Sequence, residues 1–293
     1  MNHGHEKQPN IRKILVSLAF IIGVGSSVPL VTNALTNAYS SFEANSATVS
    51  APAMSVSDAS ASGGSAVKFT AAADSGGGIC NNPFASTSVA RGDISIPGTP
   101  YLVRNEAWSD SHGPQTIYAC SEQSWYVMSN QTDQGGAVQT YPDTLYSVTG
   151  TKSKVISQYT SVTSTFAEEY QNQGNWNAAY DIWMNNWSKE IMIWNEWNGG
   201  PSYWADRART QGTAVTLGGV PYHYAKNGTI LQFFRDTEVK SGSVDILAAL
   251  QWLQARGDLT ATDKLTQIEY GVEICSTVGT QRFDTTGFTV DVN

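Results

Sequence analysis

Short runs of alternating apolar and polar residues fill the chain from Ile79 onward. The runs are rich in β-branched and aromatic residues, and Gly, Pro, Asn or Asp separates them, which is typical of a protein built from many short strands. We predict strands at residues 101–103, 115–118, 125–128, 179–184, 190–194, 230–234, 267–274 and 288–292. The pattern therefore predicts an all-β sandwich or jelly roll.

One segment has the spacing of a helix instead of a strand. Ser243 is suited to an N-cap, and Gly257 stands where a C-terminal cap belongs. Between them, apolar residues recur at helical spacing: Val244, Ile246, Leu247, Leu250 and Leu253. We predict a single amphipathic helix that packs against the outside of a sheet.

Two glutamates stand within apolar strand patterns. Glu190 begins the run Glu-Ile-Met-Ile-Trp, and Glu273 lies in the run Tyr-Gly-Val-Glu-Ile-Cys. An unpaired carboxylate is costly to bury, so these positions indicate a function for both acids. Paired carboxylates beside flat aromatic surfaces are suited to the cleavage of a glycosidic bond.

Strand alternation predicts which side chains share a face. Glu190, Met192 and Trp194 should share one face, while Ile191 and Ile193 point into the core. In the preceding strand, Asp181 and Trp183 should lie on the same face as Glu190. This face is expected to form the polar and aromatic floor of a cleft.

The turn between these two strands allows two registers. A two-residue turn at Asn185 and Asn186 would place Asp181 directly across from Glu190. A four-residue loop at 185–188 would place Trp183 opposite Glu190 and Asp181 on the diagonal. Both registers put the two carboxyl groups on one face, where their repulsion should leave a proton on one of them or shared between them.

Composition narrows the classes of partner. The 293-residue chain has a formal net charge of −8, which argues against a nucleic-acid partner. Its charged fraction is only 14%, and such surfaces occur in many secreted proteins that bind neutral sugars. His112 and His223 have no partner at a recognisable ligand spacing, so we expect no metal site and no cofactor.

The N-terminal part has the layout of an export signal. Lys7, Arg12 and Lys13 precede an apolar stretch at 14–25, and small residues follow, so we predict a signal peptide at 1–38, with an uncleaved anchor as the alternative. Residues 39–75 are rich in Ser and Ala and predict a disordered linker. The domain at 76–293 would then be secreted and extracellular, without a membrane once the leader is removed.

Three cysteines suit an exported protein with one disulfide and one free thiol. Cys80 and Cys120 lie at the two ends of the first extended region, and we expect them to pair. Cys275 would then be a buried free thiol. The alternative is that all three cysteines are reduced.

From about Cys80 to Val292, the chain resembles family 12 of the glycoside hydrolases. The resemblance rests on Tyr-Asp-Ile-Trp at 180–183, Glu-Ile-Met-Ile-Trp at 190–194 and Gly-Val-Glu at 271–273, with Asn-Glu-Ala-Trp at 105–108 and Tyr-Pro at 141–142. It implies a β-jelly roll of two curved antiparallel sheets whose concave face binds a β-glucan chain. It also implies an endo-β-1,4-glucanase or xyloglucanase that retains anomeric configuration. We expect the protein to be a monomer.

The resemblance assigns roles to particular residues. It makes Glu190 the nucleophile, Glu273 the acid and base, and Asp181 the residue that orients the nucleophile. Trp108 would stack on a sugar ring in the non-reducing half of the cleft. The other expected substrate-binding residues are Asn105, Trp125, Met192, Trp183 and, in the opposite half, Trp204.

Several departures from the family pattern leave the substrate open. Glu106 and Ser109 replace residues that the family usually has as Asn and Gly, and Cys275 replaces a residue that is commonly aromatic. The alternatives to a cellulose-type substrate are xyloglucan and mixed-linkage glucan, with the loop at 199–209 deciding between them. A lectin-like sandwich that binds glucan without cutting it is a further alternative, although such a module needs no trio of acids.

Overall fold

The computed structural model describes residues 53–57, 65–69 and 78–293. In the smaller part, β1 (Ala53–Ser57) and β2 (Ser65–Phe69) form a two-stranded sheet. The expectation that 39–75 forms a linker without structure is therefore wrong for these two strands. Each contains one Val among mostly small residues, and the second also ends in Phe69, so both include residues that favour strands. The rest of the predicted leader and linker lies outside the described residues.

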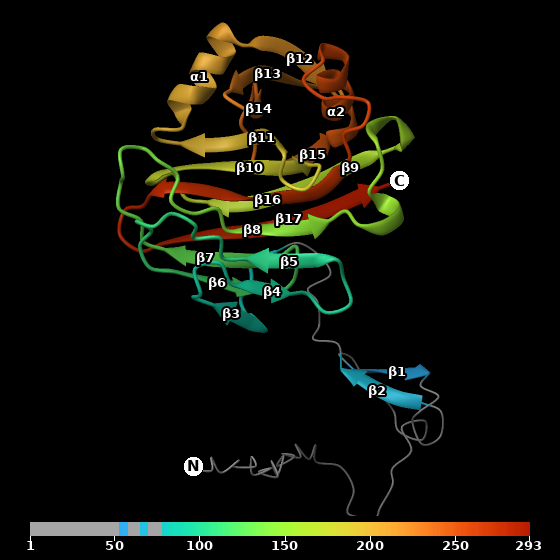
Figure 1. Cartoon of the computed structure of the whole chain (residues 1–293). Coiled ribbons are helices and arrows are strands. Elements are labelled where there is room, and N and C mark those ends of the chain that lie inside the picture. The colour runs from blue at the N-terminus through green and yellow to red at the C-terminus, as the bar shows by residue number, and fades with distance from the viewer. Residues whose placement is uncertain (1–52, 58–64, 70–77) are drawn as a thin grey trace, which may run out of the picture. The chain divides into compact units, whose positions relative to one another are not determined.

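The larger part is built from two stacked sheets (Figure 1). One has nine strands in the order β12-β13-β14-β11-β10-β16-β8-β5-β4, and the other has six in the order β15-β9-β17-β7-β6-β3. Neighbouring strands are antiparallel except for β11 and β14, which are parallel. The predicted class, a sandwich of antiparallel sheets, is confirmed.

The strands of the nine-stranded sheet are β4 (Asp93–Ser95), β5 (Tyr101–Arg104), β8 (Asp143–Ser147), β10 (Asn175–Met184), β11 (Lys189–Asn198), β12 (Thr213–Leu217), β13 (Val220–Asn227), β14 (Ile230–Arg235) and β16 (Leu265–Ser276). Those of the six-stranded sheet are β3 (Ala85–Thr87), β6 (Gln115–Ala119), β7 (Trp125–Ser129), β9 (Val162–Tyr170), β15 (Ser241–Asp245) and β17 (Gln281–Val292). Two short 3-10 helices, η3 (Gly150–Lys152) and η4 (Ile156–Gln158), follow β8. Every strand predicted from the sequence lies within one of these strands.

The main core lies between the two sheets. Ile191 and Ile193 of β11 are fully buried there with Tyr180 of β10, as alternation predicted. Phe166 of β9 and Phe288 of β17 enter the same cluster from the six-stranded sheet. Because one face of β10 and β11 packs against this core, their polar side chains must lie on the opposite face.

The predicted helix is α2 (Ile246–Arg256), and its C-terminal cap is Gly257, which has a φ of 82°. Its beginning differs from the prediction. Ser243 belongs to strand β15, and the N-cap is Asp245, whose Oδ1 accepts a hydrogen bond of 2.9 Å from the backbone N–H of Ala248. A strand that runs directly into a helix leaves no loop for the sequence pattern to reveal.

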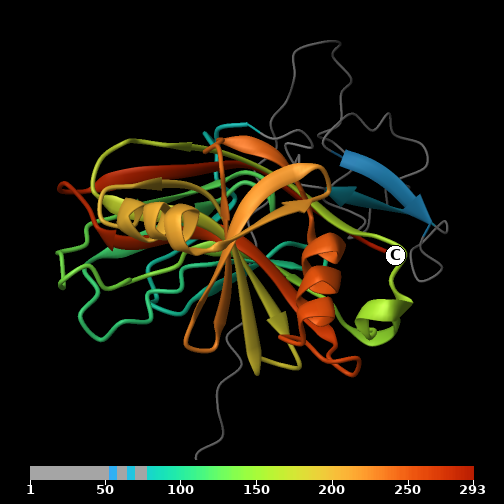
Figure 2. The same cartoon turned by 90° about the horizontal axis from the view of Figure 1, so that it is seen from above.

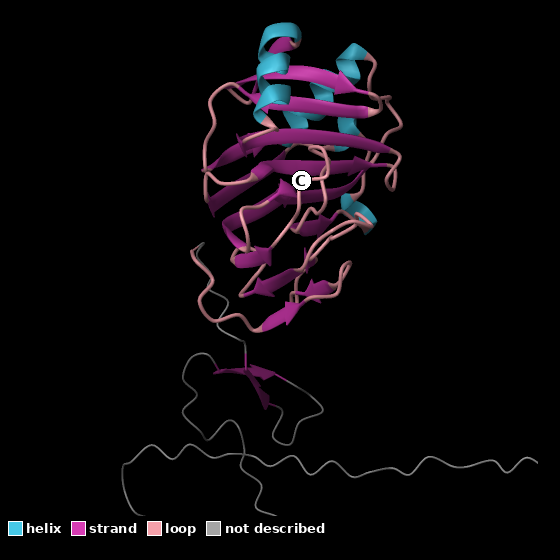
Figure 3. Ribbon diagram, turned by 90° about the vertical axis from the view of Figure 1, so that its left-hand side faces the viewer, coloured by secondary structure: helices cyan, strands magenta, loops and turns pink. Residues whose placement is uncertain are grey.

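A second helix in the described residues, α1 (Ser202–Gln211), was not predicted, so the expectation of one packed helix is wrong. Its buried residues are only Ala205 and Ala208, which pack on Trp194 and Trp197 of β11. Two alanines do not form an apolar stripe strong enough to predict this helix from the sequence. Figures 1 and 3 show both helices at the end of the sheets where β12, β13 and β14 lie, and Figure 2 shows them on opposite sides of these strands.

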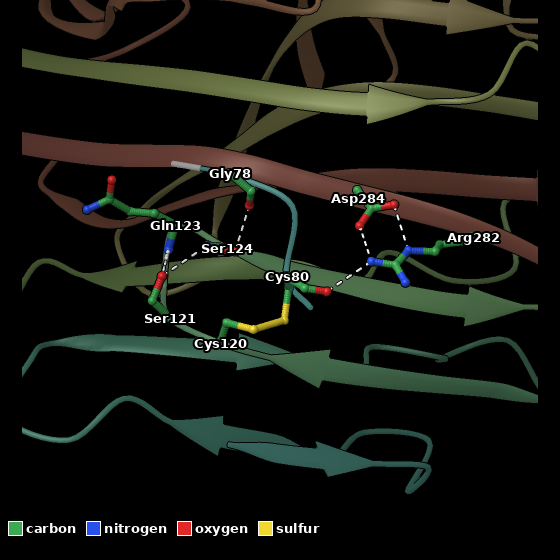
Figure 4. Close-up of a disulfide and its surroundings, with 8 residues drawn as sticks. All are labelled: Gly78, Cys80, Cys120, Ser121, Gln123, Ser124, Arg282 and Asp284. Atoms are coloured by element: carbon green, nitrogen blue, oxygen red, sulfur yellow. Dashed lines mark hydrogen bonds and ion pairs between the residues drawn. A yellow bond between two sulfur atoms is a disulfide. The ribbon is translucent and has the colours of Figure 1, made fainter. Parts of the chain in front are cut away.

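Cys80 and Cys120 form the predicted disulfide, which is confirmed (Figure 4). Hydrogen bonds surround it: Ser124 Oγ donates to the carbonyl oxygen of Gly78 (2.7 Å), and Arg282 Nη2 donates to that of Cys80 (3.0 Å). The N-terminal end of the larger part is thereby fixed to β7 and β17. Cys275 is the buried free thiol that the sequence predicted.

Among residues 53–57, 65–69 and 78–293, no helix has the length and apolarity needed to cross a membrane.

Candidate active site

The hairpin of β10 and β11 brings the first acids together. Trp183 pairs with Glu190 and Met184 with Lys189, so the loop between the strands has the four residues 185–188. The second of the two predicted registers is therefore the one observed. Asp181, which pairs with Met192, is the diagonal neighbour of Glu190 on the same face.

Strand β16 brings the second glutamate to this face from the other side of β10. Asn177 of β10 pairs with Glu273, and its Nδ2 donates a hydrogen bond of 2.8 Å to Glu273 Oε2. Because β10 lies between β11 and β16, Glu190 and Glu273 lie on either side of it. Residues 83 positions apart in the chain thus reach one surface.

Both glutamates line one cavity of about 430 Å³, together with Met192, Trp194 and Trp204. Trp204 comes from α1 and is 45% exposed. Met192 and Trp194 are almost fully buried in the floor, where they contact Phe234 in one apolar cluster. The cavity therefore combines two carboxyl groups with one accessible aromatic ring.

A second cavity, of about 370 Å³, adjoins the first. Its lining includes Asp181, Trp183 and Trp108, the last of which is 45% exposed. It adjoins the first cavity because Trp183 is the direct cross-strand neighbour of Glu190. Of the predicted residues, Trp204 thus lines the cavity that holds both glutamates, and Trp108 lines the cavity beside it.

The two glutamates have different electrostatic surroundings. Burial raises the pKa of Glu273 to about 7, and the charge of Glu190 adds to this rise while the Asn177 hydrogen bond opposes it. Burial also raises the pKa of Asp181 well above its usual range, and the charges of Glu190 and Glu273 raise it further. Burial and these charges therefore both favour the protonated form of Asp181.

A protonated Asp181 can donate a hydrogen bond to Glu190. Burial raises the pKa of Glu190, and the hydrogen bond from Asp181 opposes that rise by stabilising the ionised form. The Asp181 hydrogen bond thus favours the ionised form of Glu190, whereas Glu273, with a pKa of about 7, keeps its proton below that pH. These are the two states that a nucleophile and an acid require.

A buried ion cluster, which the sequence analysis missed, supports the second cavity. Arg104 donates two hydrogen bonds to Asp143 (3.0 and 2.8 Å) and forms an ion pair with Glu269 (2.9 Å). All three side chains are almost fully buried, and Glu269 lies four residues before Glu273 on the same face of β16. The same alternation that identified Glu273 could have pointed to Glu269, whereas Arg104 and Asp143 carried no signal in the sequence.

Two predicted substrate-binding residues are corrected by the structure. Trp125 lies in β7 of the six-stranded sheet and is fully buried in the core with Val127 and Phe283. Asn105 is also fully buried, and its side chain donates to the carbonyl oxygen of Val89 (2.9 Å) and accepts from Gln115 (3.1 Å). Neither side chain lines a cavity on the cleft face, and Asn105 instead holds the backbone that precedes Trp108.

Within the described ranges, His, Cys, Asp and Glu side chains form no group of three or more that could hold a metal ion.

Two stacked antiparallel sheets with carboxyl groups on one open face define a β-jelly roll with a cleft. The fold is that of the family 12 glycoside hydrolases, as the sequence resemblance implied. Neither a family model nor a curated protein sequence matches the chain.

Solved structures of this fold match most of the chain. The xyloglucanase domain of NopAA, a type three effector from Sinorhizobium fredii in complex with cellobiose, is 26% identical, with a TM-score of 0.64 over 72% of this chain and 100% of that domain. A family 12 xyloglucanase from Bacillus licheniformis is 23% identical, with a TM-score of 0.59 over 71% of this chain and 100% of its own. An endoglucanase from Rhodothermus marinus has the same identity and TM-score, over 71% of this chain and 99% of its own.

Proposed function

We propose that this protein is a glycoside hydrolase, an endo-acting β-glucanase that cleaves β-1,4-linked glucan with retention of anomeric configuration. The observation that supports this most strongly is the pair of Glu190 and Glu273 in one cavity, with Asp181 beside the first and a pKa of about 7 on the second. A protein that only binds sugar has no use for two carboxyl groups held in different protonation states.

In the first step, the ionised Glu190 attacks the anomeric carbon of the glucan. Glu273 donates its proton to the glycosidic oxygen as the bond between that oxygen and the anomeric carbon breaks. The leaving chain departs with a hydroxyl group, and the remaining sugar is held as an ester on Glu190.

In the second step, Glu273 acts in the opposite sense. Now a carboxylate, it accepts a proton from a water molecule that attacks the anomeric carbon and breaks the ester. Glu190 leaves as a carboxylate and Glu273 regains its proton, so the enzyme returns to its starting state. Two inversions at the same carbon give net retention.

Asp181 acts on Glu190 and not on the sugar. By donating its proton in a hydrogen bond, it orients the Glu190 carboxylate and limits the rise in its pKa that burial causes. In its protonated form, Asp181 adds no second negative charge beside the nucleophile. We propose it as a positioning residue.

Trp108 and Trp204 are the proposed sugar platforms at the two ends of the cleft. Each is 45% exposed and lines one of the two adjoining cavities. The C–H faces of a β-glucose ring are apolar, so an exposed indole beside a carboxylate pair suits stacking on a glucan chain. Met192 and Trp183 line the floor between them.

The favoured substrate is a cellulose-type glucan, and xyloglucan is the second candidate. Xyloglucan is a candidate substrate because the NopAA domain, at 26% identity, and the Bacillus licheniformis protein are both xyloglucanases. We also propose that the leader at 1–38 directs export and is removed, which the N-terminal sequence of the exported protein would test.

The test is the release of reducing ends by the purified protein from soluble β-1,4-glucan, xyloglucan, mixed-linkage glucan and xylan. Glu190→Gln is the matched control because it keeps the size of the side chain and removes its negative charge. Release from at least one glucan that is lost in Glu190→Gln supports the proposal and identifies the substrate. Binding to glucan without release from any of these polymers would instead favour a lectin-like protein.

A further inference from the structure

The loop between β10 and β11 holds a large aromatic side chain in solvent on an unusual backbone. Asn185, Asn186 and Trp187 have φ values of 52°, 51° and 72°, and Trp187 is 52% exposed. Asparagine tolerates the left-handed region, whereas a bulky residue there is strained. A smaller polar residue or glycine would remove both the strain and the exposed apolar surface.

The strained loop is fixed to the segment that precedes β16. The backbone N–H of Asn185 donates to the carbonyl oxygen of Lys264 (2.8 Å), and the N–H of Lys264 donates to Asn185 Oδ1 (2.8 Å). Asn185 Nδ2 also donates to Asp263 Oδ1 (2.7 Å), and Asp263 in turn pairs with Lys189 (2.6 Å). These contacts hold Trp187 in place, so it is a positioned side chain on a fixed loop.

Trp187 is positioned beside the cleft. Its ring centroid lies 4.9 Å from that of Trp183, with an angle of 53° between the planes. Both rings line the cavity of about 370 Å³ that also contains Trp108 and Asp181. The strain and the exposure therefore occur where the proposed glucan chain passes.

We propose that Trp187 is an additional sugar-binding platform beside Trp183 and Trp108, which recognises a glucose ring remote from the bond that is cleaved. The polar groups of a glucan would find partners in the same cavity, where Arg91 and Glu106 lie beside the tryptophans. Fixing the ring in advance lowers the entropy lost on binding. This inference rests on the proposed function and makes affinity depend on chain length.

The test compares Trp187→Ala with Trp187→Phe, which keeps a smaller aromatic face. Phe84→Ala is the matched control, because Phe84 is a 42% exposed aromatic residue that lines neither cavity of the cleft. The variants are made in a bacterial host, so that Asn186, in an Asn-Trp-Ser sequence, carries no glycan.

For a linear β-1,4-glucan hexasaccharide, we expect Trp187→Ala to raise KM by roughly tenfold, from the loss of one aromatic contact, with kcat little changed. The KM for an aryl glycoside of the disaccharide should change by less than about twofold, since a substrate this short would not reach the platform at Trp187. Trp187→Phe should recover most of the affinity, and Phe84→Ala should behave as the wild type. An equal change for both substrates, or no change for either, would overturn the inference.

Calorimetric binding of the hexasaccharide separates this inference from the proposed function. If the wild type binds but does not hydrolyse, weaker binding by Trp187→Ala still supports the platform while the proposed hydrolysis fails. If the wild type hydrolyses glucan and Trp187→Ala binds the hexasaccharide as tightly as the wild type, the platform is rejected and the proposed function stands.

Discussion

Glu190 and Glu273 carry the same carboxyl group, and their neighbours give them different properties. Glu273 is half-buried and accepts a hydrogen bond from Asn177, and desolvation raises its pKa to about 7. The hydrogen bond from Asp181 lowers the pKa of Glu190 and so favours its ionised form. One residue type can therefore supply both a nucleophile and an acid, provided that the environments differ.

Glu273→Gln should separate the two steps of the reaction. Without an acid, cleavage of a polymer should slow by about 10²- to 10⁴-fold, because a glucan hydroxyl is a poor leaving group. A dinitrophenyl glycoside needs little protonation, so its first step should be nearly unchanged, and a burst of phenol should precede slow turnover. Stopped-flow release of the phenol measures both phases. Loss of the burst together with the polymer activity would contradict the role of Glu273 as the acid.

Asp181→Ala should move the acidic side of the pH profile. The nucleophile must be ionised, so kcat/KM falls as the pH drops through the pKa of Glu190. The hydrogen bond from Asp181 lowers that pKa, and removing it should shift the acidic limb to higher pH. The alkaline limb, where Glu273 loses its proton near pH 7, should stay near its original position. A shift of the acidic limb to lower pH would show that Asp181 does not stabilise the charge on Glu190.

At the scale of the elements, strand alternation predicted much of the site. It placed Asp181, Glu190 and Met192 on one face and Ile191 in the core, since side chains in a strand have only two directions. It could not choose between a two-residue and a four-residue turn, because asparagine accepts a positive φ in either. The position of Trp187 follows from a strained loop, for which no sequence pattern exists.

Other features could not be predicted from the sequence because they depend on packing between distant elements. Helix α1 buries only alanines, so the element that carries Trp204 had no visible apolar stripe. Trp125 has the residue type of a sugar platform, and only the sheet order shows that it belongs to the sandwich core. Contacts between strands far apart in the chain decide such cases, and they cannot be read from local pattern.

The ion cluster that joins β5, β8 and β16 beside the second cavity should contribute to the stability of the fold. Arg104→Met would leave Asp143 and Glu269 buried without their cation, and we expect a loss of about 3–5 kcal/mol in the free energy of unfolding. Urea denaturation at neutral pH measures this loss. Arg91→Met, at an exposed arginine lining the same cavity, is the matched control and should change stability by less than about 0.5 kcal/mol. An equally stable Arg104→Met variant would show that the cluster contributes nothing net.

In the whole molecule, the disulfide closes a loop that contains β3 and β6 of the six-stranded sheet and β4 and β5 of the nine-stranded sheet, and neither cysteine lines the cavities that hold the glutamates and Asp181. The cysteines are 40 positions apart, and the double variant Cys80→Ser and Cys120→Ser should lose about 3–4 kcal/mol of stability through the larger entropy of the unfolded chain. The melting temperature should fall, while kcat/KM at 25 °C stays close to that of the wild type. A large loss of activity in the folded double variant would show that the disulfide also shapes the cleft.

The two sheets have different roles in the molecule. The six-stranded sheet carries the disulfide and closes the core, while the nine-stranded sheet supplies the carboxyl groups from β10, β11 and β16 on its open face. Loops and α1 then add the exposed tryptophans at its edges. Substrate preference is therefore expected to change with the loops, and the reaction with the three central strands.

In the proposed mechanism, Glu190 attacks the sugar and holds it covalently. The most direct test is to incubate the protein with a 2-deoxy-2-fluoro glycoside of a glucan disaccharide that carries a good leaving group. The protein is then digested with a protease, and the masses of its peptides are measured by mass spectrometry. The fluorine slows both steps, and the good leaving group restores the first, so the ester should accumulate. We predict one sugar on the peptide that contains Glu190, and none in Glu190→Gln. A label on another carboxylate, or steady turnover of glucan by a protein that never forms the ester, would contradict this account.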